Sequence, residues 1–490
     1  MTGWEQVYHI GPAVTLLGGA GVVLLADMIL PRGRAPFALL TLLVLALAAG
    51  WAIWHANTGT TGPSFDGAVV TDRFALFFIF LFIAATAAVT IASTDWVKKL
   101  DLSAEYYALL LVAAGSMSLL VQGNDLILIF VALETTALVQ YVLVGLTRRD
   151  RSAEAGIKYL ISGAVAAGLM IYGFAFLFGT TGATSLDGIA SFVQAGHEEA
   201  RLPLTLGFVL VAAGFGFKMA LVPFHGWAPD VYQGGPTPII SFLSVASKAG
   251  GFAIALRLFY TGLGGSETFI SEDWAMMFGV LAVASMLFGN IAALVQTDLR
   301  RLLGYSSIAQ AGNIAIGLAA VSTGSTLGPS GVMFFLATYV ATNLGAFFAV
   351  IAISQRIGSY EIGDYAGLIR RSPMLAAILM LCLLSLTGIP PTAGFIAKIY
   401  IFNSAVQAGE QWLIVLVAVA VVNTAVSAYY YLRLARTMIV DDAKDEMTFR
   451  PTLSMQVVLV FAAVTVIFVG LVPAPLISAA QRAAETLQIQ

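Results

Sequence analysis

Apolar residues fill the chain in runs of about twenty, separated by short polar connections. Each run is long enough to cross about 30 Å of hydrocarbon as an α-helix. The runs are continuously apolar and lack the alternation of a membrane β-barrel strand. The pattern predicts an all-α, polytopic, multi-pass membrane protein with about 14 transmembrane helices. The predicted spans are 11–30, 36–55, 73–94, 105–122, 125–146, 153–178, 204–222, 237–260, 274–296, 301–321, 330–355, 373–406, 411–436 and 453–474.

The spans fall into four predicted segments. Residues 1–100 contain three N-terminal transmembrane helices, and residues 450–490 contain one C-terminal helix. Between them, residues 101–260 and 274–440 form two five-helix repeats of inverted orientation. The repeats are similar in architecture, and few of their residues are identical.

Two spans contain helix-breaking residues in their interior. Pro223 follows Lys218 in the seventh span, and Pro390 and Pro391 precede Lys398 in the twelfth. Proline removes a helix N–H and clashes with the preceding turn. Inside a membrane such breaks are tolerated where the loosened backbone faces protein or water. Broken helices at matching positions of two halves indicate a transport site.

The composition of the chain argues against several other classes of protein. The chain has 490 residues, 59% hydrophobic and 10% charged, whereas soluble domains carry about 25% charged residues. A net charge of −3 gives no reason to expect a nucleic-acid partner. The single cysteine, Cys382, excludes a disulfide framework, and four scattered histidines suggest no metal site. No phosphate-binding loop or dinucleotide fingerprint is present, so we expect no cofactor in this chain.

Basic residues concentrate in alternate connections. One set of connections holds sixteen basic residues, and the other set holds four. The positive-inside rule then places the richer set in the cytoplasm and both chain termini on the periplasmic side. The richer set is Arg32, Arg34, Lys98, Lys99, Arg148, Arg149, Arg151, Arg300, Arg301, Arg356, Arg370, Arg371, Arg433, Arg436, Lys444 and Arg450; the other is Arg73, Arg201, Arg257 and Arg482.

Four ionisable residues are expected deep inside apolar spans. At 1.5 Å per helical residue, they lie roughly 12–21 Å from the ends of their spans. A charged group at that depth costs several kcal/mol, so it is a functional candidate by default. Together they suggest a proton or ion path, and they are Glu134, Lys218, Lys248 and Lys398.

Removal from water changes how readily these groups gain and release protons. Burial favours the neutral form of an amine or a carboxyl group, and a nearby opposite charge favours the charged form. If their helices touch, a changing separation between Glu134 and Lys218 would switch Lys218 between holding and releasing a proton. Lys248 would then relay laterally, and Lys398 would connect to one aqueous side. The alternative for each group is a purely structural ion pair.

Three further residues are secondary candidates. Glu154 and Lys158 are spaced i,i+4 near a helix start, which favours a simple ion pair over a place in the path. Lys158 is also close enough to the helix end to extend to the membrane surface. His225 follows Pro223, where capping of the backbone and proton handling are equally good interpretations.

The sequence resembles the antiporter-like membrane subunits of respiratory complex I. The resemblance is carried by Lys218-Met-Ala-Leu-Val-Pro-Phe-His225-Gly-Trp-Ala-Pro-Asp-Val-Tyr-Gln-Gly-Gly-Pro-Thr-Pro238 with Ser247-Lys248, and by Gly388-Ile-Pro-Pro-Thr-Ala-Gly-Phe-Ile-Ala-Lys398. Glu134 is similar to the family's fifth-helix glutamate. Lys398 stands where the M-type sister subunit has glutamate. The short segment after the last span argues against the L type, which has a long extension.

The resemblance implies a proton-translocating subunit of NADH:quinone oxidoreductase. Glu134, Lys218, Lys248 and Lys398 would carry proton transfer, with Lys158 as a weaker candidate. No redox chemistry is expected in this chain, because FMN, iron–sulfur clusters and quinone would belong to other subunits. The implied partners are lipids and other membrane subunits, including neighbouring antiporter-like ones, in a bacterial inner membrane. The open alternatives are a subunit of a cation/proton antiporter or membrane-bound hydrogenase, and a purely structural subunit.

Overall fold

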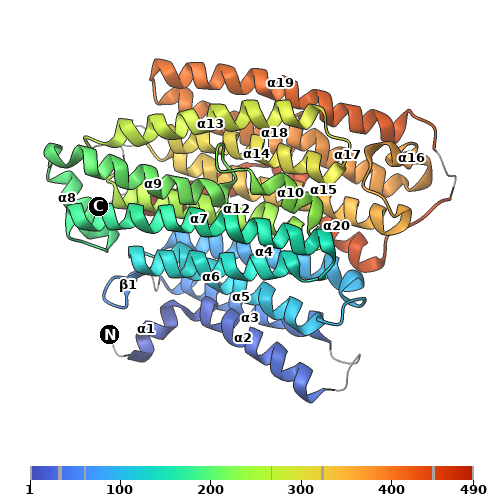
Figure 1. The fold of residues 1–490 in the computed structure, drawn as a ribbon, viewed down its shortest axis with the longest axis horizontal. Coiled ribbons are helices and arrows are strands. Elements are labelled where there is room, and N and C mark those ends of the chain that lie inside the picture. Colours follow the sequence, from blue (N-terminus) through green and yellow to red (C-terminus); the bar gives the residue numbers. More distant parts are fainter. Residues whose placement is uncertain are drawn as a thin grey trace.

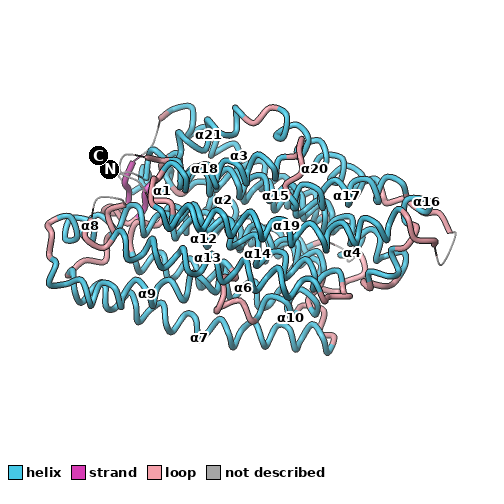
Figure 2. The backbone as a smooth tube through the Cα atoms, turned by 90° about the horizontal axis from the view of Figure 1, so that it is seen from above, coloured by secondary structure: helices cyan, strands magenta, loops and turns pink. Residues whose placement is uncertain are grey.

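A computed structural model of the chain describes residues 3–30, 36–59, 62–265, 268–321, 325–443 and 447–487. Long α-helices lie side by side with similar axes, from α2 and α3 on one flank to α19 on the other (Figure 1; Figure 2). Thr71 Oγ1 donates to the His9 carbonyl, and the Phe74 N–H donates to Thr486 Oγ1. Both ends of the chain therefore lie at the same end of the bundle, as an even number of spans requires.

The first half of the chain contains the following elements: α1 (Gly3–His9), α2 (Gly11–Ile29), α3 (Phe37–Thr58), β1 (Gly62–Ser64), β2 (Val69–Thr71), α4 (Arg73–Val97), α5 (Ser103–Gln122), α6 (Leu126–Gly145), α7 (Asp150–Thr181), α8 (Leu186–Gln194), η1 (Glu198–Ala200), α9 (Arg201–Met219), α10 (Trp227–Gly234), α11 (Thr237–Phe242), η2 (Leu243–Ser247), α12 (Lys248–Leu256) and η3 (Arg257–Gly262). The strands β1 and β2 pair antiparallel, and they form the only sheet among the described residues.

The second half contains the following elements: α13 (Ser271–Leu294), α14 (Leu299–Ala319), α15 (Leu327–Ile357), η4 (Ile362–Tyr365), α16 (Leu368–Arg371), α17 (Pro373–Thr387), α18 (Ala393–Gln407), α19 (Gln411–Ile439), α20 (Leu453–Leu471), α21 (Ala474–Ala484) and η5 (Glu485–Leu487).

The predicted class, a polytopic all-α membrane protein, is confirmed. Twelve helices in the described part are long and apolar enough to cross a membrane. The predicted span 301–321 is α14, whose length is sufficient but whose sequence is more polar. The predicted span 373–406 is two shorter helices, α17 and α18, separated at the proline pair. The inverted relation of the two repeats stays a prediction.

The most enclosed helices lie at the centre of the bundle. In the run α11, η2, α12 and η3 every residue except Thr261 is buried, and α15, which packs against α17, α18 and α20, is nearly as enclosed. Peripheral helices such as α19 turn large apolar side chains outward. An outward apolar surface of this kind faces lipid or other membrane proteins.

Polar residues define where several helices begin. The carboxylate of Asp125 accepts hydrogen bonds from the N–H groups of Ile127 and Leu128 and so caps α6. Asp72 and Asp298 cap α4 and α14 in the same way. These caps fix the ends of the spans against their connections.

The structure corrects one assignment in the loop-charge pattern. Arg257 was expected in a connection, but it lies within η3 and its side chain is only 2% exposed. Its guanidinium forms a bidentate pair with Asp72, at 2.5 and 3.0 Å, and donates to the Val121 carbonyl at 2.8 Å. An apolar helix can contain an arginine when a neighbouring helix supplies the carboxylate. Arg32, Arg34 and Lys444 lie outside the described residues.

Candidate functional site

The first helix break ends α9 one residue after Lys218. The helix stops at Met219, Ala220 adopts a left-handed conformation (φ 59°), and α10 begins at Trp227. The freed backbone groups find partners inside the protein. The indole of Trp227 donates to the Phe217 carbonyl at 2.9 Å. The buried Lys218 amine therefore lies at the break itself, nearer to it than the sequence predicted.

A single amide oxygen anchors Lys218. Its Nζ donates to Gln140 Oε1, on α6, at 2.9 Å. The same oxygen accepts from Ser247 Oγ at 2.9 Å and from Tyr159 OH at 3.2 Å. Three donors from α9, η2 and α7 thus meet on one acceptor in the core. The Gln140 Nε2 has no hydrogen-bond partner among the described residues.

Glu134 lies on the same helix as Gln140, and its side chain is partly buried. It lines a cavity of about 10 Å³ together with Lys218 and Tyr141. No oxygen of Glu134 lies within 4.0 Å of a basic nitrogen in the described part of the chain. The structure therefore places Glu134 and Lys218 in the wall of one cavity, without an ion pair between them. A cavity of that size is near the lower limit for one water molecule, ~10–15 Å³.

Lys248 follows a π-helical turn, which is a frequent feature of functional sites. Its Nζ donates to both the carbonyl and the hydroxyl of Ser307, on α14, at 2.5 Å. The Ser307 hydroxyl is also bonded to Tyr339 OH at 3.0 Å and to Tyr232 OH at 3.2 Å. Ser247 and Lys248 are neighbours in the chain, so one backbone segment joins the Gln140 cluster to the Ser307 cluster.

Lys398 spans the second break. Its Nζ donates to the carbonyl of Thr387, the last residue of α17, at 2.9 Å and to Thr424 Oγ1 at 3.3 Å. Gly388 caps α17 with φ 90°. A Cβ added at Gly388 would lie 2.9 Å from Lys398 Cδ. The glycine therefore supplies both the turn and the space for the lysine.

A second small cavity separates the Lys248 cluster from Lys398. It measures about 10 Å³, and both Tyr339 and Lys398 line it. Four further hydroxyl and amide side chains line it beside Phe335, Leu386 and Gly394, namely Gln310, Thr338, Thr342 and Ser385. The structure thus brings all four principal candidates into one chain of polar groups, in the order Glu134, Lys218, Lys248 and Lys398. The hydrogen bonds are interrupted at three places, namely at each of the two cavities and between Ser247 and Lys248, which are joined only as neighbours in the chain.

The three secondary candidates lie outside this chain of groups. Lys158 pairs with Glu154 at 2.8 Å and with Asp230 at 3.0 Å, and its side chain is 47% exposed. Those contacts agree with the simple ion pair favoured by the spacing. His225 is partly buried, with its ring 4.5 Å from that of Phe288.

Gln140, Ser307 and Tyr339 were not predicted as site residues. The only signal in the sequence is that each is polar within or beside an apolar span. No group of three or more His, Cys, Asp or Glu side chains that fits a metal ion occurs among the described residues.

This arrangement defines an antiporter-like polytopic membrane protein, with two broken helices and buried titratable groups between them. Residues 123–424 match the family described as NADH:quinone oxidoreductase/Mrp antiporter, transmembrane. The chain belongs to this family, and the resemblance seen in the motifs is confirmed.

Individual proteins of known sequence or structure are similar to this chain over nearly its full length. The chain is 39% identical over 483 residues to NADH-quinone oxidoreductase subunit N of Dehalococcoides mccartyi, covering 97% of this chain and 99% of that protein. A chain of respiratory complex I from Thermus thermophilus with bound aureothin has a TM-score of 0.79 at 32% identity, covering 95% and 98%. A chain of the Mrp complex from Dietzia sp. DQ12-45-1b has a TM-score of 0.83 at 20% identity, covering 100% and 98%. This last likeness concerns the fold alone.

Proposed function

We propose that this chain is the N-type membrane subunit of a bacterial NADH:quinone oxidoreductase and that it translocates protons. The observation that carries the proposal is the series of neighbouring polar groups from Glu134, which is partly buried, to Lys398, which is buried. The series includes four titratable side chains, linked through Gln140 and Ser307 and through two small cavities. Relatives at about 39% identity over nearly the full length support the assignment to subunit N.

Each buried lysine is held by neutral partners. Lys218 donates to an amide, Lys248 to a hydroxyl and a carbonyl, and Lys398 to a carbonyl and a hydroxyl. Neutral acceptors only partly compensate the cost of burying an ammonium group, so a nearby charge has a large influence on whether the amine holds its proton. Such an amine gains and releases a proton when a nearby charge changes.

Glu134 supplies the changing charge for Lys218. When the pair closes across its cavity, the carboxylate stabilises the ammonium form. When the pair is open, as in this structure, Lys218 releases its proton more easily. The hydroxyls of Ser247, Ser307 and Tyr339 both donate and accept, so they can pass a proton between the lysines. Quinone reduction in other subunits would drive the alternation.

The redox groups belong to other subunits in this proposal. NADH oxidation and quinone reduction need FMN, iron–sulfur clusters and a quinone site, and this chain is assigned a translocase role only. Its partners are the other membrane subunits, including neighbouring antiporter-like chains, and lipids. The peripheral apolar faces support such contacts.

The proposed location is the bacterial inner membrane. The end of the bundle with the basic connections would face the cytoplasm, and both termini would lie on the periplasmic side. The loop charges support this orientation, and Arg257 no longer counts among them.

Proton pumping in vesicles tests the proposal. The complex with Glu134→Ala or Lys218→Ala is reconstituted, and NADH oxidation and proton uptake are measured together. We expect each variant to lose most of its proton uptake per NADH oxidised, because each removes one group from the series. Normal proton uptake in both variants would reject the proposal. An Asp27→Asn variant, outside the series, is the control.

A cation/proton antiporter subunit is the second candidate, favoured only by the shared fold with the Mrp complex. It predicts exchange of Na⁺ or K⁺ for protons in vesicles that contain no NADH. Co-purification with an NADH-oxidising flavoprotein distinguishes the two.

A further inference from the structure

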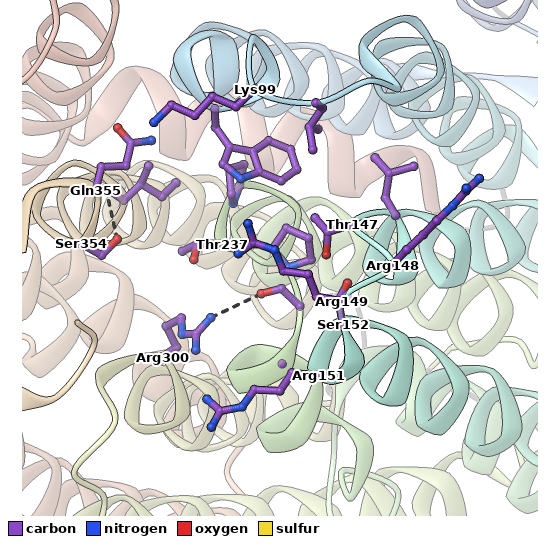
Figure 3. Close-up of a pocket in the computed structure, with 18 of the residues that line it drawn as sticks. Lys99, Thr147, Arg148, Arg149, Arg151, Ser152, Thr237, Arg300, Ser354 and Gln355 are labelled. Atoms are coloured by element: carbon purple, nitrogen blue, oxygen red, sulfur yellow. Dashed lines mark hydrogen bonds between the residues drawn. The ribbon is translucent and has the colours of Figure 1, made fainter. Parts of the chain in front are cut away.

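A cavity of about 670 Å³ opens at the end of the bundle where the basic connections lie (Figure 3). It lies apart from the chain of buried lysines and shares no lining residue with either small cavity. Its walls come from the α4–α5, α6–α7 and α10–α11 connections, the start of α14 and the end of α15. Side chains far apart in the sequence therefore face one space.

The lining of this cavity is strongly cationic. Five basic side chains and only one carboxylate, that of Asp101, line it. Among the described residues no carboxylate oxygen lies within 4.0 Å of four of the five basic side chains. The five are Lys99, Arg148, Arg149, Arg151 and Arg300.

Arg300 is the most firmly held member of the set. It is buried, stacks on the Tyr360 ring at 3.6 Å and lies 3.7 Å from Asp298. Figure 3 shows the Arg149 side chain on the same side of the cavity as Arg300, while Arg148 extends away. Guanidinium groups bind phosphate oxygens through charge-assisted and often bidentate hydrogen bonds.

Two further features fit an anionic ligand with an apolar part. The N-terminus of α7 opens at the cavity and has no side-chain cap, so its positive end adds to the field. Asp150, in the first turn of α7, is not part of the lining. Part of the wall is apolar, and its large apolar side chains are Trp96, Leu100, Leu102, Leu146 and Ile351.

We propose that this cavity binds a phosphate-bearing anion, supplied either by an acidic phospholipid headgroup or by free inorganic phosphate. Basic pockets between helices at this level of a membrane protein suit lipid phosphates. The volume is within the range of small-ligand sites, ~300–1,000 Å³. The mixed wall would hold a glycerol backbone beside the phosphate. The proposal is independent of proton conduction.

Native mass spectrometry of the full chain in detergent tests the site. Phosphatidylglycerol, phosphatidylcholine and inorganic phosphate are titrated separately. The test variant combines Lys99→Gln and Arg149→Gln, both exposed and both in the lining. The control combines Lys98→Gln and Arg370→Gln, which remove two exposed charges outside the lining.

We expect the test variant to bind phosphatidylglycerol about thirtyfold more weakly than the unchanged chain. The control variant should bind as the unchanged chain does, and phosphatidylcholine should bind weakly to all. Competition by millimolar phosphate would identify free phosphate as the source, and its absence would identify the lipid. Equal binding of phosphatidylglycerol and of phosphate by both double variants would overturn the proposal.

Discussion

Gln140 joins three helical segments through one oxygen atom. Its Oε1 accepts from Lys218, Ser247 and Tyr159, and all four side chains are buried. A neutral acceptor in this place holds the Lys218 amine on α6, the helix that also carries Glu134, without an ion pair. The amide thus determines which neighbour Lys218 faces while the ion pair is open.

Replacing Gln140 with leucine should impair both stability and transport. Three buried donors lose their acceptor, at a cost of roughly 1–3 kcal/mol for each group left unsatisfied. We expect a lower detergent-unfolding midpoint and a clear loss of proton uptake per NADH oxidised in reconstituted vesicles.

Gln122→Leu is the matched control for this variant. Gln122 is also buried, and its amide donates to the His9 carbonyl and to Thr71, away from the lysines. It should lower the unfolding midpoint and leave the ratio of protons to NADH unchanged. Equal ratios in both variants would leave Gln140 with a structural role only.

For single residues, the sequence identifies the buried charged groups more readily than the neutral side chains that form hydrogen bonds with them. Lys218 and Glu134 are conspicuous because an ionisable group in an apolar span is costly. Ser307 is not, because a buried serine usually bonds to its own helix, as Ser118 does with the Ala114 carbonyl at 2.8 Å. Only the tertiary structure, which brings the Lys248 amine of α12 to Ser307 of α14, distinguishes the two serines.

The two helix breaks differ in how they accommodate their lysines. Lys218 is the penultimate residue of α9, whereas Lys398 lies in the second turn of α18 and reaches back to the end of α17. The sequence predicted both breaks because proline and glycine disrupt helices at any depth. It did not predict the reach of Lys398, which depends on the angle between the half-helices.

Gly388 supplies both a left-handed backbone and the space beside Lys398, and Gly388→Ala disturbs both. The left-handed backbone costs a residue with a Cβ about 1–2 kcal/mol, and the new methyl would also press on Lys398 Cδ. We expect a lower unfolding midpoint together with reduced proton uptake.

Gly358→Ala provides the comparison. Gly358 has φ 70° at the end of α15, and nothing lies within 4 Å of an added Cβ. It should carry the backbone cost without any effect on transport. Unchanged proton uptake in Gly388→Ala would show that Lys398 tolerates displacement.

The pair between Arg257 and Asp72 connects η3 to the start of α4. Arg257→Gln should destabilise the protein by about 3–5 kcal/mol, because it leaves a buried carboxylate unpaired. Thermal unfolding in detergent measures the loss. Arg201→Gln, which breaks an exposed pair with Asp273, should change the midpoint little. Similar midpoints for the two variants would contradict this assignment.

Across the whole molecule, the four titratable groups follow one another in a single series of contacts and shared cavities. The sequence predicted the helices that contribute them, because apolar length fixes the number of spans. It did not predict the π-helical turns η2 and η3 or the short helices α8 and α21, which depend on contacts between distant segments. The order of the groups likewise follows from packing rather than from spacing.

A series arrangement makes a specific prediction for combined variants. Glu134→Gln and Lys398→Met should each strongly reduce proton uptake, and the double variant should be no worse than the more severe single one. Independent routes would instead give losses that add. Proton uptake by reconstituted complexes, normalised to assembled protein, makes the measurement.

The two 10 Å³ cavities have a consequence for the resting membrane. A proton does not cross several ångströms of dry protein, and each cavity has room for at most one water. With either cavity empty, the protein is an insulator, and the voltage across the bilayer does not drain through it. Conservation of the membrane potential then requires that water stays out of these two cavities between turnovers and enters them only when a proton is transferred.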